Sequence, residues 1–387
     1  MFRPLRLMLV SGALACMLFS WWEDTEDQSL SKLLEIRKWF HENIPDLESA
    51  QCNPVSTPPS DRHMTIVTYG RDTPDHHGYA ELSSVIARDR SLLKGVDISV
   101  GVLQGMIQDK QSAESLHIFK YTEVSVVSLV NTPIKNEDTM GIPSMLNYFK
   151  NSLQNLKWVG LSAQSYVICD VNGIKVGFIA VCMPHTDCSH DPTPNKYQSL
   201  APVIYHKESF QSTVKQLHSH GASSVVVLTY WGRQHALIPE DHTLLTAQQM
   251  SAAGANLIIG NYPLVMQDHA YIGNNTLVIF SQGSVSVNKN DLCWTEGDPD
   301  WYFKEEVRGC RLVHPHLRER LKHDERQMRL YKIMISDNGL VHADYLTIDL
   351  VESAWKPSCL KASHSGTKLW TRACSSEDAH CLTCDYY

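Results

Sequence analysis

VVVLTYWGRQHALIPEDHTLLTAQQMSAAGANLIIGNYPLVMQDHAYIGNNTLVIFSQGSV, residues 225–285, holds three short apolar runs separated by turns and one helical segment. The runs Val225–Leu228, Leu257–Ile259 and Leu277–Phe280 are bounded by Gly, Pro or Asn and are followed at once by polar residues. Short bounded runs of this kind are typical of buried strands. The stretch therefore predicts three buried strands whose ends carry the loops in which a site would lie.

The same alternation of strands and helices extends on both sides of this stretch. Asn172-Gly173 between two β-rich runs is a strong hairpin signal, and Gly254 marks the end of a helix. The patterns predict further strands at Met64–Tyr69, Ile98–Leu103, Val124–Val130, Trp158–Gly160, Tyr166–Val171, Ile174–Cys182, Arg329–Ile335 and Val341–Leu350, with helices at Ile142–Leu153, Lys207–Ser219 and Glu240–Ala253. This order favours an α/β fold of two sheets sandwiched between helices.

The turns after the three strands carry a family resemblance. They read Tyr230-Trp231-Gly232, Gly260-Asn261-Tyr262-Pro263-Leu264 and Ser281-Gln282-Gly283-Ser284. In order and spacing they resemble the CapA-type family, bacterial capsule-synthesis proteins linked to poly-γ-glutamate, whose turns read His-Trp-Gly, Gly-His-His-Pro-His and Ser-Leu-Gly-Asn. The resemblance covers residues 62 to 350 and implies a metallophosphoesterase-like, four-layer αββα sandwich. The turns of this chain keep the order and spacing of the family's turns but lack their histidines.

Three earlier turns extend the resemblance. Gly70-Arg71 stands where the family has Gly-Asp, Val102-Leu103-Gln104 where it has Asn-Leu-Glu, and Val130-Asn131-Thr132-Pro133 where it has Ala-Asn-Asn-His. Of these positions only Asn131, together with Asp138 after a short insertion, keeps a residue type that can bind a metal. The resemblance implies a function in capsule or poly-γ-glutamate biosynthesis.

A two-metal phosphoesterase site needs clustered Asp, His and Asn side chains that hold two cations about 3.5–4 Å apart. Arginine repels a cation, proline has no side-chain donor atom, and a neutral tyrosine is a poor metal ligand. The substituted positions are Arg71, Gln104, Pro133, Tyr230, Tyr262 and Leu264. We therefore interpret the chain as resembling a CapA-type member that lacks the dinuclear metal centre and uses no metal or cofactor. The alternative is a hydrolase that uses a divalent metal such as Mn, Fe or Zn in a rebuilt site around Asp72, Asp138, His235, His242 and His269.

No catalytic residue can be assigned, so the predicted site is a ligand-binding one. Aromatic side chains with one arginine suit an anionic, polyglutamate-like or carbohydrate ligand. The residues predicted to bind it are Asn131, Asp138, Tyr230, Trp231, Arg233, Asn261 and Tyr262. Trp231 could equally serve only to pack its turn.

Composition limits the partners. The chain has 387 residues, with 34 Lys+Arg against 42 Asp+Glu and a net charge of −8. Because no long basic run is present, nucleic-acid binding is not expected.

The start of the chain has the features of a secretory signal. Arg3 and Arg6 precede an apolar run from Leu7 to Trp22, which falls short of the about 20 residues that span a bilayer. Residues 1–22 are therefore predicted to be a signal peptide, or else an N-terminal anchor that would be the only membrane contact. Residues 29–62 follow as a helix and linker, then a CapA-like domain at 63–350 and a Cys-rich tail at 351–387. The protein is expected to be secreted or extracellular.

An even number of cysteines behind a signal peptide indicates disulfides. Beyond Cys16 they are Cys52, Cys169, Cys182, Cys188, Cys293, Cys310, Cys359, Cys374, Cys381 and Cys384. Asn274 lies in an Asn-Asn-Thr sequon and is a predicted glycosylation site. These features leave a third hypothesis, a structural, disulfide-rich secreted protein.

Overall fold

The computed structural model describes residues 62–72, 93–103, 124–130, 141–184, 186, 188, 200–233, 236, 239–263, 265–273, 276–283, 327–351, 354–357 and 371–372. The chain divides into two units, Met1–Gln51 and Cys52–Tyr387, and every described residue belongs to the second. The predicted signal segment, the N-terminal helix, Asn131, Asp138, His235 and Asn274 lie outside the described residues.

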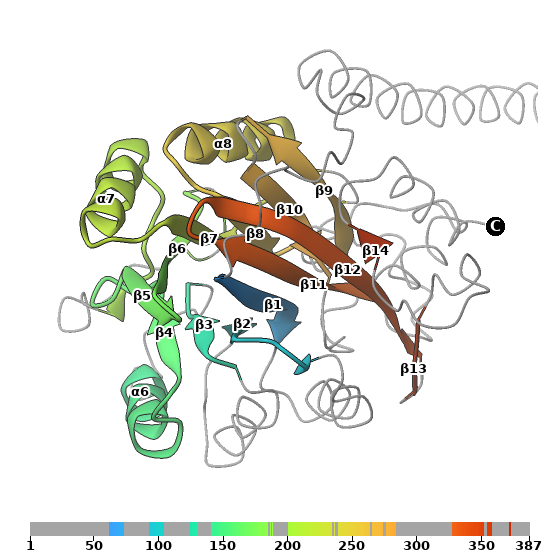
Figure 1. Cartoon of the computed structure of the whole chain (residues 1–387), viewed down its shortest axis with the longest axis horizontal. Helices are drawn as coiled ribbons and strands as arrows, with labels where there is room; N and C mark the ends of the chain where they lie inside the picture. Colours follow the sequence, from blue (N-terminus) through green and yellow to red (C-terminus); the bar gives the residue numbers. More distant parts are fainter. Residues whose placement is uncertain are drawn as a thin grey trace, which may run out of the picture. The chain divides into compact units, whose positions relative to one another are not determined.

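The first sheet has the order β13-β12-β11-β1-β2-β3-β4, with β14 also pairing with β12 (Figure 1). Its parallel strands are β1 (His63–Asp72), β2 (Ile98–Leu103), β3 (Val126–Ser128) and β4 (Lys157–Val159). Its antiparallel part holds β11 (Gln327–Ser336), β12 (Gly339–Val351), β13 (Ala354–Pro357) and β14 (Thr371–Arg372). The last two strands belong to the predicted Cys-rich tail, so part of that tail joins the main sheet.

The second sheet has the order β5-β6-β7-β8-β10-β9. Its parallel strands are β6 (Ile174–Cys182), β7 (Ser224–Tyr230), β8 (Leu257–Asn261) and β10 (Thr276–Gln282). The antiparallel strands β5 (Tyr166–Val171) and β9 (Met266–Ile272) form its edges. The predicted hairpin is confirmed: Asn172 and Gly173 both have positive φ, as a two-residue type I′ turn requires.

Three helices accompany the sheets. α6 (Gly141–Ser152) buries Met145 and Phe149 in one core cluster with residues of the first sheet. α7 (Lys207–Ser219) and α8 (Asp241–Ala252) connect strands of the second sheet and lie on its side of the molecule in Figure 1. The larger core cluster joins alternate residues of both sheets, Met64 and Ile66 with Leu228 for example, so the sheets pack face to face. The predicted α/β fold with two sheets is confirmed, and the structure adds that both sheets are mixed.

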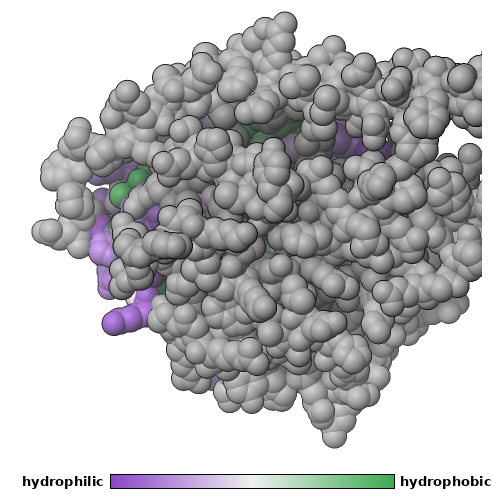
Figure 2. Space-filling view, turned by 90° about the vertical axis from the view of Figure 1, so that its right-hand side faces the viewer, coloured by the Kyte–Doolittle hydropathy of each residue, from purple (hydrophilic) through white to green (hydrophobic). Residues whose placement is uncertain are grey.

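The described surface is mostly hydrophilic. In the view of Figure 2 the coloured residues that reach the surface are largely purple, with small green areas. Within the described ranges only Leu245 and Val341 are large hydrophobic residues with exposed side chains. No helix in the same ranges is long and apolar enough to cross a membrane.

Candidate functional site

The family-like turns lie at the carboxyl ends of neighbouring parallel strands. Cys182 pairs with Tyr230, and Tyr230 with Asn261, so the last residues of β6, β7 and β8 stand side by side. In the first sheet, β1, β2 and β3 also run parallel. Ligands of open α/β sheets bind outside the carboxyl ends of such strands. This edge is therefore the candidate site.

Two tyrosines stand at this edge. The rings of Tyr230 and Tyr262 are tilted against each other, with centroids 4.3 Å apart, and both residues are buried. Tyr262 has a φ of 113°, a backbone conformation that a side chain of this size rarely adopts. Strained residues of this kind cluster at functional sites.

Asn261 pairs with Tyr230 across the strands and directly precedes Tyr262 in the sequence. It is 1% exposed, and neither its Oδ1 nor its Nδ2 has a hydrogen-bond partner. Its backbone oxygen accepts from Trp231 N at 3.1 Å. A buried, unpaired amide costs about 1–3 kcal/mol for each unsatisfied group, so this side chain is poised for a partner.

Trp231 is fully buried, and its indole Nε1 donates to Phe280 O at 2.9 Å. The indole also explains Gly260, because a Cβ there would overlap both Trp231 Nε1 and Phe280 O. Trp231 thus locks β7 and β8 to β10 beneath the site. The structure shows that Trp231 packs these strand ends together. The predicted contact of Trp231 with a ligand stays a prediction.

Gln282 joins the two sheets at the same edge. Its Nε2 lies 2.6 Å from Thr68 Oγ1, 3.1 Å from Thr68 O and 2.9 Å from Arg329 O. Gln282 ends β10 in the second sheet, whereas Thr68 and Arg329 belong to β1 and β11 in the first. Its Oε1 is buried and has no hydrogen-bond partner.

β1 contains a β-bulge at its family-like turn, Gly70-Arg71. β1 has one extra residue between Thr68 and Arg71 relative to β2. In an unbroken register Arg71 would pair with Leu103, but Asp72 does so instead. The bulge therefore places Asp72, and not Arg71, opposite Leu103.

Charged side chains gather at the start of α8. Arg233 Nε lies 3.6 Å from Glu240 Oε1, and His242 Nε2 lies 3.7 Å from Glu240 Oε2. The Arg233 side chain is 52% exposed. Exposed pairs of this kind contribute only about 0–1 kcal/mol to stability, so Arg233 remains available to an anionic ligand.

His269 lies elsewhere, on β9. Its Nδ1 is 3.1 Å from Tyr331 OH, and its ring also packs against Tyr345. Among the residues with a described placement, no three His, Cys, Asp or Glu side chains come together as a metal cluster. The described members of the predicted rebuilt site, His242 and His269, therefore do not form one by themselves.

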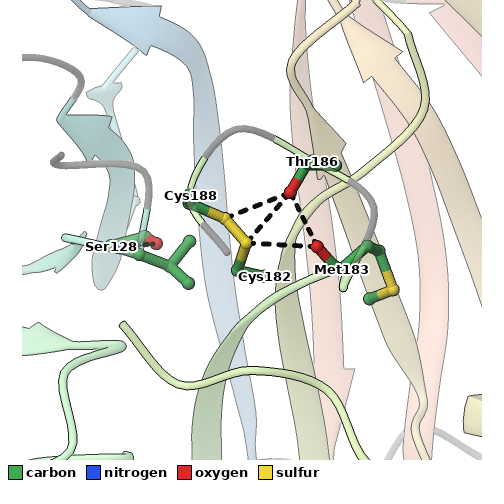
Figure 3. The surroundings of a disulfide bond; sticks show 6 residues. Ser128, Cys182, Met183, Thr186 and Cys188 are labelled. Atoms are coloured by element: carbon green, nitrogen blue, oxygen red, sulfur yellow. Dashed lines mark hydrogen bonds between the residues drawn. A yellow bond between two sulfur atoms is a disulfide. The ribbon is translucent and has the colours of Figure 1, made fainter. Parts of the chain in front are cut away.

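A disulfide between Cys182 and Cys188 lies at the end of β6, with Ser128 of the first sheet beside it (Figure 3). Thr186 donates to Met183 O at 2.8 Å within the loop that the disulfide closes. The expectation that Cys188 belongs to a disulfide is confirmed, and the bond closes a loop at the end of β6.

The expectation of a disulfide at every cysteine is wrong for Cys169, which is free. Cys169 lies on β5 with its side chain in the core cluster between the sheets. Burial raises the pKa of its thiol, although Lys157 opposes that shift. It behaves as a small core residue.

Sequence reasoning missed Gly260, Glu240, Gln282 and Arg329 as parts of this edge. Gly260 and Gln282 stand inside the family-like turns, so their place in those motifs was an available signal. Arg329 is 1% exposed, with its guanidinium 4.6 Å above the Tyr345 ring. Nothing local in the sequence distinguishes that arginine, because its position depends on the pairing of β11 with β1.

The family comparison agrees with these strand-end motifs. A model described as bacterial capsule synthesis protein PGA_cap matches residues 68–289. The chain belongs to this family. The matched PGA_cap region runs from the end of β1 to just beyond β10, so it contains every turn described above.

Two curated relatives share the PGA_cap region at low identity. PGA biosynthesis protein CapA of Bacillus subtilis (strain 168) is 25% identical over 215 residues, 53% of this chain and 50% of that protein. Capsule biosynthesis protein CapA of Bacillus anthracis is 23% identical over 252 residues, 63% of this chain and 52% of that protein. The chain spans about half the length of the curated relatives it matches.

Solved structures with a similar arrangement include phosphatases. A Mycoplasma pneumoniae phosphatase has a TM-score of 0.46 and 10% identity, covering 74% of this chain and 94% of its own. A calcineurin-like phosphoesterase of Bacillus subtilis has a TM-score of 0.36 and 14% identity, covering 76% and 88%.

A dinuclear metal centre does not fit the described part of this edge. Tyr230, Asn261 and Tyr262 offer one good oxygen ligand, the Asn261 amide, where two cations need several charged or imidazole ligands. The side chains of Arg71 and Asp72, and the whole of Gln104, Asn131 and Asp138, lie outside the described placement. Whether the protein holds a metal stays a prediction.

Proposed function

We propose that this chain binds an anionic polymer of the poly-γ-glutamate kind at the carboxyl ends of β7 and β8, as an accessory protein without two-metal catalysis. Membership of the PGA_cap family and the names of the two CapA relatives support the ligand class. The features of residues 1–22 support secretion, where such a polymer would be met.

The observation that carries the proposal is the chemistry of the strand ends. Tyr230, Asn261 and Tyr262 supply aromatic faces and an unpaired amide in place of metal ligands. Once Tyr262 moves aside, these groups can hold a polar polymer by stacking and hydrogen bonding, but they cannot generate a metal-bound hydroxide.

Arg233 supplies the charge for an anionic ligand. It follows Trp231-Gly232 directly after β7, and its guanidinium is half exposed beside Glu240. Arginine binds carboxylates through two parallel hydrogen bonds, and a partial surface ion pair is easily exchanged for a ligand carboxylate.

Binding of a fluorescent γ-linked glutamate oligomer, followed by anisotropy, tests the proposal. Arg233→Gln should weaken binding at least about tenfold, because hydrogen bonds to a charged group contribute about 1.5–3 kcal/mol. Arg62→Gln is the matched control: Arg62 is 60% exposed and pairs with Asp337 at 3.4 Å, at the amino end of β1. Absence of binding by the unaltered protein, or equal loss in both variants, would contradict the proposal.

A second candidate function is a metal-dependent hydrolase with a rebuilt site. The bulge in β1 favours it, since it places Asp72, a residue type that can bind a metal, opposite Leu103, where an unbroken register would place Arg71. The metal content of purified protein, measured by mass spectrometry after incubation with Mn²⁺, Fe²⁺ or Zn²⁺ and dialysis, separates the two functions. About one or two retained equivalents that Asp72→Asn removes would establish a metal site at this edge and overturn the metal-free accessory role.

A further inference from the structure

The Asn261 side-chain amide indicates which chemical groups its ligand contains, in addition to the charge of that ligand. The side chain faces the space between the two sheets, because Leu257 and Ile259, at alternate positions of β8, lie in the inter-sheet core. Asn261 is 1% exposed, with both polar atoms unpaired. A deeply buried amide at the strand ends with no partner on either atom marks a place where a ligand group can bind.

The two unpaired atoms discriminate between kinds of ligand. A cation would bind only the amide oxygen and would leave the Nδ2 hydrogens without an acceptor. A carboxylate would accept from Nδ2 and leave Oδ1 unpaired. An amide-linked polymer, by contrast, offers both N–H donors and C=O acceptors, so Nδ2 can donate to the C=O of one linkage while Oδ1 accepts from the N–H of the next.

We infer that Asn261 is a specificity-determining residue that recognises the amide linkages of the polymer, while Arg233 attracts its carboxylates. This inference rests on the proposed function. The rings of Tyr230 and Tyr262 pack against each other beside this residue, with centroids 4.3 Å apart. Tyr230 pairs with Asn261 across the strands, and Tyr262 follows it in the sequence.

Access to the amide requires a neighbouring side chain to move. Tyr262 follows Asn261 directly, has an unfavourable φ of 113° and is 9% exposed. A backbone held in this conformation gains from any rearrangement that relaxes it, which lowers the cost of opening at this residue.

The test compares two polyanions of matched length: a γ-linked glutamate oligomer, which has an amide in every repeat, and polyacrylate, which has carboxylates without amides. The unaltered protein should bind the glutamate oligomer at least about tenfold more tightly, as expected for two hydrogen bonds to buried groups. Asn261→Asp replaces the donor with a second acceptor and should reduce that preference to within about twofold.

Asn256→Asp is the matched control. Asn256 precedes the other end of β8, and its Oδ1 accepts from Val225 N at 2.8 Å, a bond that Asp can keep. This variant should retain the full preference for the glutamate oligomer. Thermal unfolding of both variants establishes that they are folded, and if Asn261→Asp is not, the Asn261 side-chain amide resonances of the unaltered protein are followed instead. They should shift with the glutamate oligomer and not with polyacrylate.

The outcomes are distinct. Equal binding of the two polymers, with or without Asn261, would overturn amide recognition and leave anion binding intact. Binding of neither polymer would overturn the proposed function together with this inference. Mn²⁺ binding by the unaltered protein that Asn261→Asp strengthens would identify the side chain as a cation ligand and overturn the inference.

Discussion

At the scale of single residues, Gly260 shows how the candidate site depends on close packing. The indole of Trp231 lies so close above Gly260 that a Cβ would overlap its Nε1 and the Phe280 oxygen. The hydrogen bond from Trp231 to Phe280 depends on that approach. Gly260 therefore allows three strand ends, β7, β8 and β10, to meet.

Gly260→Ala should lower the free energy of unfolding by about 3 kcal/mol or more, because two backbone or ring atoms must shift in a fully packed region. Gly95→Ala is the informative control: Gly95 has a φ of 70°, but nothing lies within 4 Å of an added Cβ. Its cost should be about 1 kcal/mol, from backbone strain alone. Equal losses in urea denaturation would show that steric overlap is not what requires Gly260.

Local chemistry made several elements predictable. The Asn172-Gly173 turn, the helix at Lys207–Ser219 and the strand at Ile98–Leu103 were predicted with the bounds that the structure shows. Each depends on residues close together in the sequence, either through turn dihedral angles or through periodic burial. Such local features do not depend on contacts with distant segments of the chain.

Features that depend on distant segments were not predictable. The bulge that brings Asp72 opposite Leu103 exists only in relation to β2, and the comparison of motifs, which matched Gly70-Arg71 to the family's Gly-Asp, gave no sign of it. The Asn261 amide is likewise unpaired because its neighbours in the folded structure offer it no hydrogen bond, and those neighbours come from distant segments. At the candidate site, residue types could be read from the motifs, whereas pairing and register could not.

At the scale of elements, the Cys182–Cys188 disulfide fixes a loop to the end of β6. The two cysteines are separated by six positions. In the chain-entropy model a loop of that size stabilises the folded state by about 2 kcal/mol. The loop lies beside the end of β3, where Ser128 is seen in Figure 3.

Replacing both Cys182 and Cys188 with Ala should lower the free energy of unfolding by about 2 kcal/mol under oxidising conditions. A reducing agent should remove the stability difference between the unaltered protein and the double variant, because it opens the same disulfide in the unaltered protein. Cys169→Ala is the control, since that thiol is free and its removal should not alter the response to the reductant. A reductant effect that persists in the double variant would assign it to other cysteines.

At the scale of the whole molecule, the two sheets meet over a shared apolar core and are joined by polar contacts at one end. The core alone is non-directional, since apolar packing fixes contact but not register. Gln282 is directional: from the second sheet it reaches Thr68 and the backbone of Arg329 in the first. The relative placement of the strand ends, and hence the shape of the candidate site, depends on such contacts.

Gln282→Leu, which introduces the residue of the family motif, should lower the free energy of unfolding by about 2–3 kcal/mol, because buried oxygens of Thr68 and Arg329 lose their donor. Amide hydrogen exchange should accelerate in β1 and β10 more than in β5. Gln267→Leu is the matched control, since Gln267 Nε2 donates at 2.6 Å to Ala236 O, a contact that does not cross between the sheets. If both variants accelerated exchange in β1 equally, Gln282 would be one buried hydrogen-bond donor among others, and the registration of the sheets would rest on their apolar faces.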